Sequence, residues 1–399
     1  MSSGSTNLGA TLAQRLAVRE QQGLLRHRLL RHGAQQPELT LDGRALVSFC
    51  SNDYLGLANH PQVLTACRAG LDRYGLGSGA SHLVTGHSEA HHALEEELAD
   101  FLGRERALLF STGYMANVGV INALVQEGDL VLQDALNHAS LLDGGWLSRA
   151  PSRRYAHRDA RSLQFMLEAS SASQHLIVTD GVFSMDGDLA PLTDLIPLAR
   201  RHRAWLMVDD AHGIGCLGEH GRGIIEAFGV SGRLATQEEV PILIGTLGKA
   251  FGTSGAFVAG EAALIQYLVQ CARPYVYSTA LPAAIAHATR TSLRLVQEEP
   301  WRRQRLQALV ARFRQRALAL GLTLTDSATP VQAVILGDVA RAMRASQILR
   351  EEGLQVSAIR PPTVPVGTAR LRITFCATHT DAHLERLLRA LERISHDVS

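Results

Sequence analysis

The sequence has almost no lysine. Of its 39 basic residues 38 are arginine, and Lys249 is the single lysine in 399 residues. Arginine can replace lysine on most solvated surfaces, because both side chains carry one positive charge on a long stem. It cannot replace lysine as a nucleophile, since a guanidinium stays protonated whereas a desolvated amine can lose its proton and attack a carbonyl. A codon bias would explain the scarcity of lysine, but not the position of Lys249.

Other features are scarce as well, and each scarcity excludes a class of protein. Five cysteines (Cys50, Cys67, Cys216, Cys271, Cys376) lie far apart without a CxxC pair, which argues against a disulfide framework or a zinc site. No apolar run could span a bilayer, and the first residues lack the pattern of a secretion signal. With 39 basic and 38 acidic residues, no overall charge favours nucleic acid or an anionic membrane. We therefore expect a cytoplasmic protein without a metal, nucleic-acid or membrane partner.

Short apolar runs alternate with helical patterns between residues 105 and 260. The runs are ALLF (107–110), DLVL (129–132), HLIVT (175–179), WLMVD (205–209), PILIGT (241–246) and GAFVAG (255–260). Runs of this kind are typical of strands buried on both faces, so we predict the α/β class, with a mostly parallel sheet covered by helices on both sides. In such sheets, ligands bind beyond the carboxyl ends of the strands.

The sequence pattern predicts three parts of the chain. Residues 1–45 form an N-terminal segment with an amphipathic helix over residues 12–33, and residues 46–290 form the large domain. Residues 291–399 form a smaller α+β domain, with an arginine-rich helix over 301–320, strands near 331–338, 355–359 and 369–375, and a closing helix over 381–394. The length of 399 residues and the 46% of hydrophobic residues are enough to form a hydrophobic core for two domains.

Two glycine-containing segments follow predicted strands. Gly113 lies in STGYMAN, where a helix begins directly after ALLF, and the free backbone N–H groups of a helix start attract anions. Gly213, Gly215 and Gly218 match the G-x-G-x-x-G fingerprint of dinucleotide binding. The polar EHGRG that follows does not continue as a packed helix, which argues against a nicotinamide cofactor.

The residues after the other strands suggest a different cofactor. Asp209 ends a buried strand, and a carboxylate there is costly unless it faces a cation or several donors. A protonated pyridine nitrogen is such a cation, and the imidazole of His212 could bind a phenolic oxygen on the same ring. The alternative is an ordinary core pair that caps a turn.

Further candidate groups lie at the same predicted edge. Lys249 and Thr246 follow PILIGT, His138 follows DLVL and Ser184 follows HLIVT. One edge thus collects an amine, a carboxylate, two imidazoles, hydroxyls and an anion-binding turn. Pyridoxal phosphate needs this set of groups, so their joint placement favours it although each is weak alone.

Seven segments resemble, in order and spacing, the α-oxoamine synthases of the aspartate-aminotransferase fold. They are SNDYLGL, FSTGYMAN, NHASLLDG, TDGVFSMDGDLAPL, VDDAHGIG, GTLGKAFGTSGAF and RPPTVPVGTARLRIT, and the resemblance extends from about residue 12 to 395. It implies a homodimeric enzyme of fold type I that uses pyridoxal phosphate. The nearest resemblance is to members that join L-alanine to a pimeloyl thioester in biotin biosynthesis. The thiol carrier is left open between coenzyme A and an acyl carrier protein.

The resemblance also implies a role for each candidate residue. The catalytic residues are Lys249, which carries the cofactor, Asp209, which pairs with the ring nitrogen, and His138, which stacks on the ring. Further cofactor contacts come from His212 at the ring oxygen, Ser184 beside the ring, Gly113, Tyr114 and Thr246 at the phosphate, and Thr279 at the phosphate of the neighbouring subunit. Substrate contacts come from His138, Arg26, Thr363 and Arg372, with Arg360 close by.

Three alternatives stay open at this point. The first is an α-oxoamine synthase that uses glycine or serine with another acyl group, as in serine palmitoyltransferase. The second is an inactive subunit that only binds a partner, although such a subunit could lose Lys249 freely. The third is a nicotinamide oxidoreductase. One position departs from the family pattern, because Ala80 replaces a usual glycine near the acyl substrate.

Overall fold

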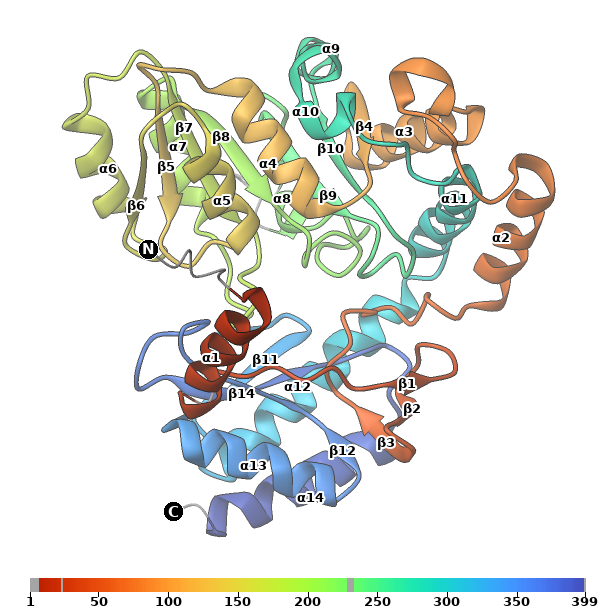
Figure 1. The fold of residues 1–399 in the computed structure, drawn as a ribbon, viewed down its shortest axis with the longest axis vertical. Coiled ribbons are helices and arrows are strands. Elements are labelled where there is room, and N and C mark those ends of the chain that lie inside the picture. The colour runs from red at the N-terminus through yellow and green to blue at the C-terminus, as the bar shows by residue number, and fades with distance from the viewer. Residues whose placement is uncertain (1–6, 23, 228–232, 398–399) are drawn as a thin grey trace.

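The computed structural model describes residues 7–22, 24–227 and 233–397, which form two lobes (Figure 1). One lobe is built around a seven-stranded sheet, and the other contains two smaller sheets of four and three strands. In the described part of the chain, no helix is both long and apolar enough to cross a membrane.

The large sheet has the mixed order that positions the candidate site. Its strands, in spatial order, are β4 (Arg106–Phe110), β10 (Ala256–Gly260), β9 (Ile242–Thr246), β8 (Trp205–Asp209), β7 (His175–Asp180), β5 (Leu130–Asp134) and β6 (Ser152–Tyr155). The five strands from β9 to β6 are parallel, and β10 is antiparallel to both of its neighbours. The predicted α/β class and mostly parallel sheet are therefore confirmed, and each predicted run forms one of these strands.

Both faces of this sheet are covered, as the continuous apolar runs predicted. Side chains alternate along each strand, so that Val131 joins one hydrophobic cluster and Leu132 joins the other. The cluster around Val131 is covered by α4 (Gly113–Leu124), α5 (Ala139–Leu147), α9 (Ala262–Cys271) and α10 (Arg273–Val276). The cluster around Leu132 is covered by α2 (Pro61–Tyr74), α3 (Glu89–Leu102), α6 (Ala160–Glu168), α7 (Leu192–Arg201), α8 (Ile224–Ala227) and α11 (Ala283–Glu298).

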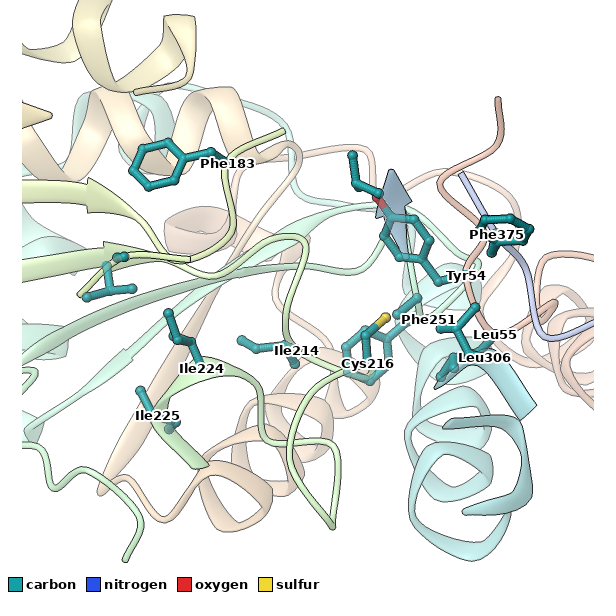
Figure 2. Close-up of a cluster of buried hydrophobic side chains, with 14 of the residues drawn as sticks. Tyr54, Leu55, Phe183, Ile214, Cys216, Ile224, Ile225, Phe251, Leu306 and Phe375 are labelled. Carbon is teal, nitrogen blue, oxygen red and sulfur yellow. The ribbon is translucent and has the colours of Figure 1, made fainter. Parts of the chain in front are cut away.

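The larger cluster continues from one lobe into the other. Figure 2 shows part of it, where Tyr54, Phe251, Leu306 and Phe375 come from segments far apart in the sequence. Because these aromatic and aliphatic side chains are buried together, they hold the segment around Tyr54 against the large sheet.

The second lobe combines both ends of the chain. One sheet has the order β1 (Arg31–His32), β2 (Glu38–Leu41), β3 (Arg44–Ser48) and β12 (Leu354–Gln355), and the other has the order β11 (Val331–Gly337), β14 (Ala369–Thr374) and β13 (Ser357–Ile359). They pack with α12 (Trp301–Ala319), α13 (Val339–Glu351) and α14 (Asp381–Asp397). The division at residues 45 and 290 stays a prediction. The pairing of β3 with β12 links the first two predicted parts to the third, and α11 crosses residue 290.

The predicted N-terminal helix is shorter than expected. Helix α1 (Leu8–Gln21) begins at the side-chain cap of Asn7, and residues 31 and 32 form β1 instead of extending the helix to residue 33. Backbone pairing with β2, together with hydrogen bonds between Leu30 and Asp42, holds that stretch extended. The prediction of a helix through residue 33 was therefore wrong, because strand pairing overrides local helix propensity.

Candidate active site

A hydrogen-bonded chain leads from the single lysine into the core. Lys249 follows β9, and its Nζ lies 2.9 Å from Nε2 of His212. Nδ1 of His212 lies 2.6 Å from the hydroxyl oxygen of Tyr54, which in turn donates to Oδ1 of Asn52 at 3.2 Å. Donors and acceptors match throughout when His212 is neutral and protonated on Nδ1, so that Nε2 can accept a hydrogen from the amine.

Burial changes the acidity of both nitrogen groups in this chain. It lowers the pKa of the Lys249 amine, while the carboxyl groups of Asp209 and Asp180 act in the opposite direction. Burial, and then the charge of Lys249, hold the pKa of His212 well below its ordinary value. His212 is thus a neutral imidazole beside an amine that loses its proton more easily than a surface lysine does.

Asp209, at the end of β8, forms a second pair of polar side chains with Asn117. Asp209 is 5% exposed, and its Oδ2 accepts a hydrogen bond from Nδ2 of Asn117 at 2.6 Å. Its Oδ1 accepts the backbone N–H of Ala211 at 3.0 Å. Among the residues that the structure describes, no ion pair neutralises this carboxylate. A buried carboxylate that is held by neutral donors and has no described cation within ion-pair distance fits a cationic ring nitrogen, which satisfies one requirement of pyridoxal phosphate.

His138 lies next to this pair and is connected to it. It precedes α5, and its Nδ1 lies 2.7 Å from Oγ of Ser140, which also accepts from Asn117 at 2.8 Å. The backbone N–H of His138 donates to Oδ2 of Asp180 at 2.6 Å. Burial lowers the pKa of His138, partly offset by Asp209. The imidazole is thus held near the Asp209 carboxylate in a largely neutral form.

An anion-binding turn lies at the start of α4. Thr112 caps this helix by accepting the N–H of Met115, and the two preceding amides, of Gly113 and Tyr114, have no acceptor within the helix. A methyl group added at Gly113 would meet only the side chain of Ala256, at 4.0 Å, so the space beside this backbone is open. These features fit a phosphate.

Thr246 and Tyr114 flank this region, whereas Thr279 lies in another segment. Thr246 donates its hydroxyl to the backbone oxygen of Gly255 at 3.1 Å, and the hydroxyl of the exposed Tyr114 donates to Asp143 at 2.6 Å. Thr279 is exposed and forms an isolated bridge with Ser81. Its described contacts therefore do not join it to Lys249 of the same chain.

Ser184 and Arg372 meet, but through the backbone of Ser184. Nε of Arg372 donates to the carbonyl oxygen of Ser184 at 2.6 Å, and Nη2 lies 3.4 Å from Oδ1 of Asn52. Arg372 is 9% exposed and also lowers the pKa of Lys249. A buried guanidinium beside the amine is a suitable partner for a substrate carboxylate.

The other three predicted substrate residues line one cavity in the second lobe. This cavity of about 580 Å³ is bordered by Arg26, Arg360 and Thr363, and by β13 with Ser357. Because Ser357 is paired with Arg372 across the β13–β14 ladder, the cavity borders the strand that carries the buried arginine. Arg360 also contacts the sulfur of Met343 at 3.3 Å.

Five residues that contact the candidate site were not predicted from the sequence. They are Asn52, Tyr54, Asn117, Ser140 and Asp180. For Asn117 the signal was its spacing, because a residue four positions after Gly113 lies on the same helix face. Asp180 directly follows HLIVT, at the same edge as Asp209. Tyr54 gave no such signal, since its contact with His212 depends on packing between distant segments.

Comparison with known proteins finds relatives over most of the chain. Residues 44–391 match the family of class I and II aminotransferases. An 8-amino-7-oxononanoate synthase of Pseudomonas putida is 59% identical over 95% of this chain and 96% of its own length. The serine palmitoyltransferase of S. paucimobilis, solved with PLP and myriocin, has a TM-score of 0.91 and 30% identity, over 98% of this chain and 99% of its own. An 8-amino-7-oxononanoate synthase of Francisella tularensis has a TM-score of 0.76 and 33% identity, over 88% of this chain and 98% of its own.

These relationships fix the fold type and the cofactor. The two-lobed α/β architecture is that of fold type I, and the cofactor of the family is pyridoxal phosphate. Lys249, Asp209 and the turn at Gly113 are the candidates to hold this cofactor. The chain belongs to the class I and II aminotransferase family, together with relatives named 8-amino-7-oxononanoate synthase.

Proposed function

We propose that this enzyme condenses L-alanine with a pimeloyl thioester. The products are 8-amino-7-oxononanoate, carbon dioxide and the free thiol carrier, so that one carbon–carbon bond forms while the alanine carboxylate and the thiol leave. The observation that carries the proposal is the grouping of Lys249, His212 and Tyr54 beside Asp209 at the carboxyl edge of the sheet. The identity of 59% to a relative with that name supports the choice of reaction.

Lys249 has two roles in this proposal. Its amine would hold the cofactor, and once alanine is bound the freed amine would accept the α-proton of alanine at Nζ. Burial lowers the pKa of this amine, so the neutral base is more accessible than in a solvated lysine. His212, neutral and 2.9 Å away, can hydrogen-bond the amine without competing for its proton.

Asp209 and His138 stabilise the charge that develops after proton removal. Pyridoxal phosphate supplies an electron sink for this charge, provided that its ring nitrogen stays protonated. The Asp209 carboxylate would hold that proton, and Asn117 fixes the carboxylate at 2.6 Å. His138, oriented by Ser140, is the candidate to stack on the ring and to polarise the thioester carbonyl.

Different arginines would bind the two carboxylates of the reaction. Arg372 lies near Lys249 and would bind the carboxylate of alanine until it leaves as carbon dioxide. Arg26 and Arg360 lie at the cavity of about 580 Å³ and would bind the far carboxylate of the pimeloyl chain. Replacing Arg26 with glutamine should therefore raise the KM for the thioester more than the KM for alanine. Arg15→Gln, on the exposed helix α1, is the control.

A second subunit belongs to this proposal. Thr279 would reach the cofactor phosphate of the neighbouring chain. Its surroundings support a contact with a second copy, because Leu76, Val84 and Tyr277 are 80%, 75% and 72% exposed around the bridge between Ser81 and Thr279. We also propose that the enzyme works in the cytoplasm, which its five unpaired cysteines support.

A direct assay tests the proposed substrates. L-alanine, glycine and L-serine are each combined with pimeloyl-coenzyme A, a pimeloyl-acyl carrier protein and palmitoyl-coenzyme A, and products are identified by mass spectrometry. The highest kcat/KM is expected for alanine with one of the two pimeloyl thioesters, and the comparison decides between the carriers. A preference for glycine, serine or the palmitoyl thioester would contradict the proposed function. Lys249→Ala is the control for turnover.

A further inference from the structure

A group of ionisable side chains lies outside the active site, at the start of α3. His87 precedes this helix, and His92 and Glu95 lie on it three residues apart, on one face. One ligand atom from each of these three residues lies within 4.8 Å of the others. Nε2 of His87 is 4.0 Å from Oε2 of Glu95.

The distances are close to those that a metal ion requires. Ligand atoms about 2.1 Å from a tetrahedral zinc ion are about 3.4 Å from each other. Nε2 of His87 and Oε2 of Glu95 reach that separation when small side-chain rotations bring them about 0.6 Å closer. The side chain of His92 is 59% exposed, and its Nε2 lies 3.3 Å from Oε1 of the exposed Glu96. Because an exposed ion pair contributes little stability, His92 can leave it and rotate at little cost.

Other contacts orient two of these ligands. Nδ1 of His87 lies 3.1 Å from Nδ1 of His82. When His87 donates this hydrogen bond, its Nε2 keeps a free lone pair that faces Glu95. Oε1 of Glu95 accepts the backbone N–H of Leu109 at 2.9 Å, which leaves Oε2 toward His87. Outer contacts of this kind are typical of metal sites, where they set the tautomer and direction of each ligand.

The site is accessible from solvent. His87, His92 and Glu95 line a surface cavity of about 780 Å³ between α3, β4 and α9. An ion can therefore enter, and water can fill the remaining coordination positions. Two imidazoles and one carboxylate suit zinc and neighbouring transition metals better than magnesium or calcium, which prefer oxygen ligands.

A second grouping shares His87 but is less suitable. His82, His87 and His91 also lie within the same limit of one another. However, His91 is fully used, because its Nδ1 accepts the N–H of Ser88 at 3.0 Å and its Nε2 lies 2.5 Å from the carbonyl oxygen of Leu281. Ligation by His91 would break one of these buried hydrogen bonds.

We propose that His87, His92 and Glu95 form a binding site for a divalent transition metal such as zinc, separate from the active site. The cluster is linked to the segment before α11, since His82 contacts both His87 and the ring of Tyr275, with 4.9 Å between the ring centroids of His82 and Tyr275. A bound ion would therefore restrain the segment that carries Thr279.

Titration of the holoenzyme with metal tests this site. The full chain, without an affinity tag, is dialysed against a chelator and titrated with Zn²⁺ by calorimetry and with Co²⁺ by visible absorption. One ion per chain is expected, with cobalt bands of a site that has nitrogen ligands. His92→Gln should weaken zinc binding by at least about tenfold, the lower end of the loss seen when even an outer contact is removed.

The same titration is applied to a control variant, and its possible results include some that would overturn the proposal. His220→Gln removes an exposed histidine that pairs with Glu226, and it should leave zinc affinity unchanged. No zinc binding by the holoenzyme, or equal binding by His92→Gln and the unmodified chain, would overturn the proposal. Binding that is kept in His92→Gln but lost in His91→Gln would assign the ion to the other grouping and overturn it as well. None of these readouts depends on turnover.

Discussion

Replacing Asp209 with asparagine should nearly abolish turnover while the protein stays folded. The carboxylate is 5% exposed and is held by Asn117 and the N–H of Ala211, so its geometry is fixed before any ligand binds. An asparagine of the same shape can keep one of these hydrogen bonds, but it carries no charge. It cannot hold a proton on the ring nitrogen of the cofactor.

The expected loss follows from the environment of this carboxylate. Two unit charges about 4 Å apart attract each other by about 4 kcal/mol at an effective dielectric constant of about 20, which suits such a partly shielded site. If this attraction acts mainly after proton removal, its loss raises the barrier by a similar amount. A barrier increase of about 4 kcal/mol lowers kcat by about a thousandfold.

The neighbouring carboxyl group provides a matched control. Burial raises the pKa of Asp210 well above its ordinary value, and Oδ2 of Asp210 accepts the N–H of Ile224 at 2.7 Å. Because Oδ2 of Asp210 is occupied by this backbone contact and not by a residue of the candidate site, Asp210→Asn should change kcat by only a few fold. Both variants are measured for kcat, for bound cofactor by absorption, and for the free energy of unfolding. If Asp209→Asn turned over at a near-normal rate with cofactor bound, Asp209 would have no part in the mechanism.

Three further predictions concern the lysine, the subunit contact and one histidine. Borohydride treatment followed by peptide mapping should place the cofactor on Lys249, and a label elsewhere or no label would contradict this role. Mixing Lys249→Ala and Thr279→Val subunits, each weakly active or inactive, should restore activity, because a mixed dimer then has one intact site. No recovery, with subunit exchange and the Thr279 defect both confirmed, would contradict a shared site. His157, 2.8 Å from both Asp134 and Asp188, has its pKa raised to about 9 despite burial. Its stabilisation, roughly 1–2 kcal/mol after solvent screening, should be complete below pH 6.5 and be lost as pH rises through 9. The substitution His157→Gln should remove this pH dependence from the free energy of unfolding measured by chemical denaturation. An unchanged pH profile in this variant would refute the assigned role of His157.

The sheet could be predicted from the sequence because its strands are buried on both faces. Runs such as ALLF contain no polar side chain, and each run formed a strand at the expected place. The antiparallel direction of β10 could not be predicted, since an apolar run has the same composition in either direction. The stretch near Arg31 was misjudged for a related reason, because its pairing with β2 depends on a turn farther along the chain.

The candidate site was predictable to the extent that it lies at strand ends. Parallel strands bring their carboxyl ends together, and this rule was enough to group Asp209 with Lys249. Tyr54 and Asn117 reach the same place from a loop and a helix, so only tertiary packing brings them there. The grouping at His87 was not predicted, because the absence of a CxxC pair argued against a zinc site.

The single lysine is explained by the balance of charges around it. Burial and Arg372 lower the pKa of Lys249, whereas Asp209 and Asp180 raise it. An amine in this setting can gain and lose a proton during one catalytic cycle, because the two influences oppose each other. An arginine at the same position would keep its proton under every condition, and its charge would then be fixed beside that of Arg372. Arginine can therefore serve at the other 38 basic positions, including the substrate contacts at Arg372 and Arg26, but not at residue 249.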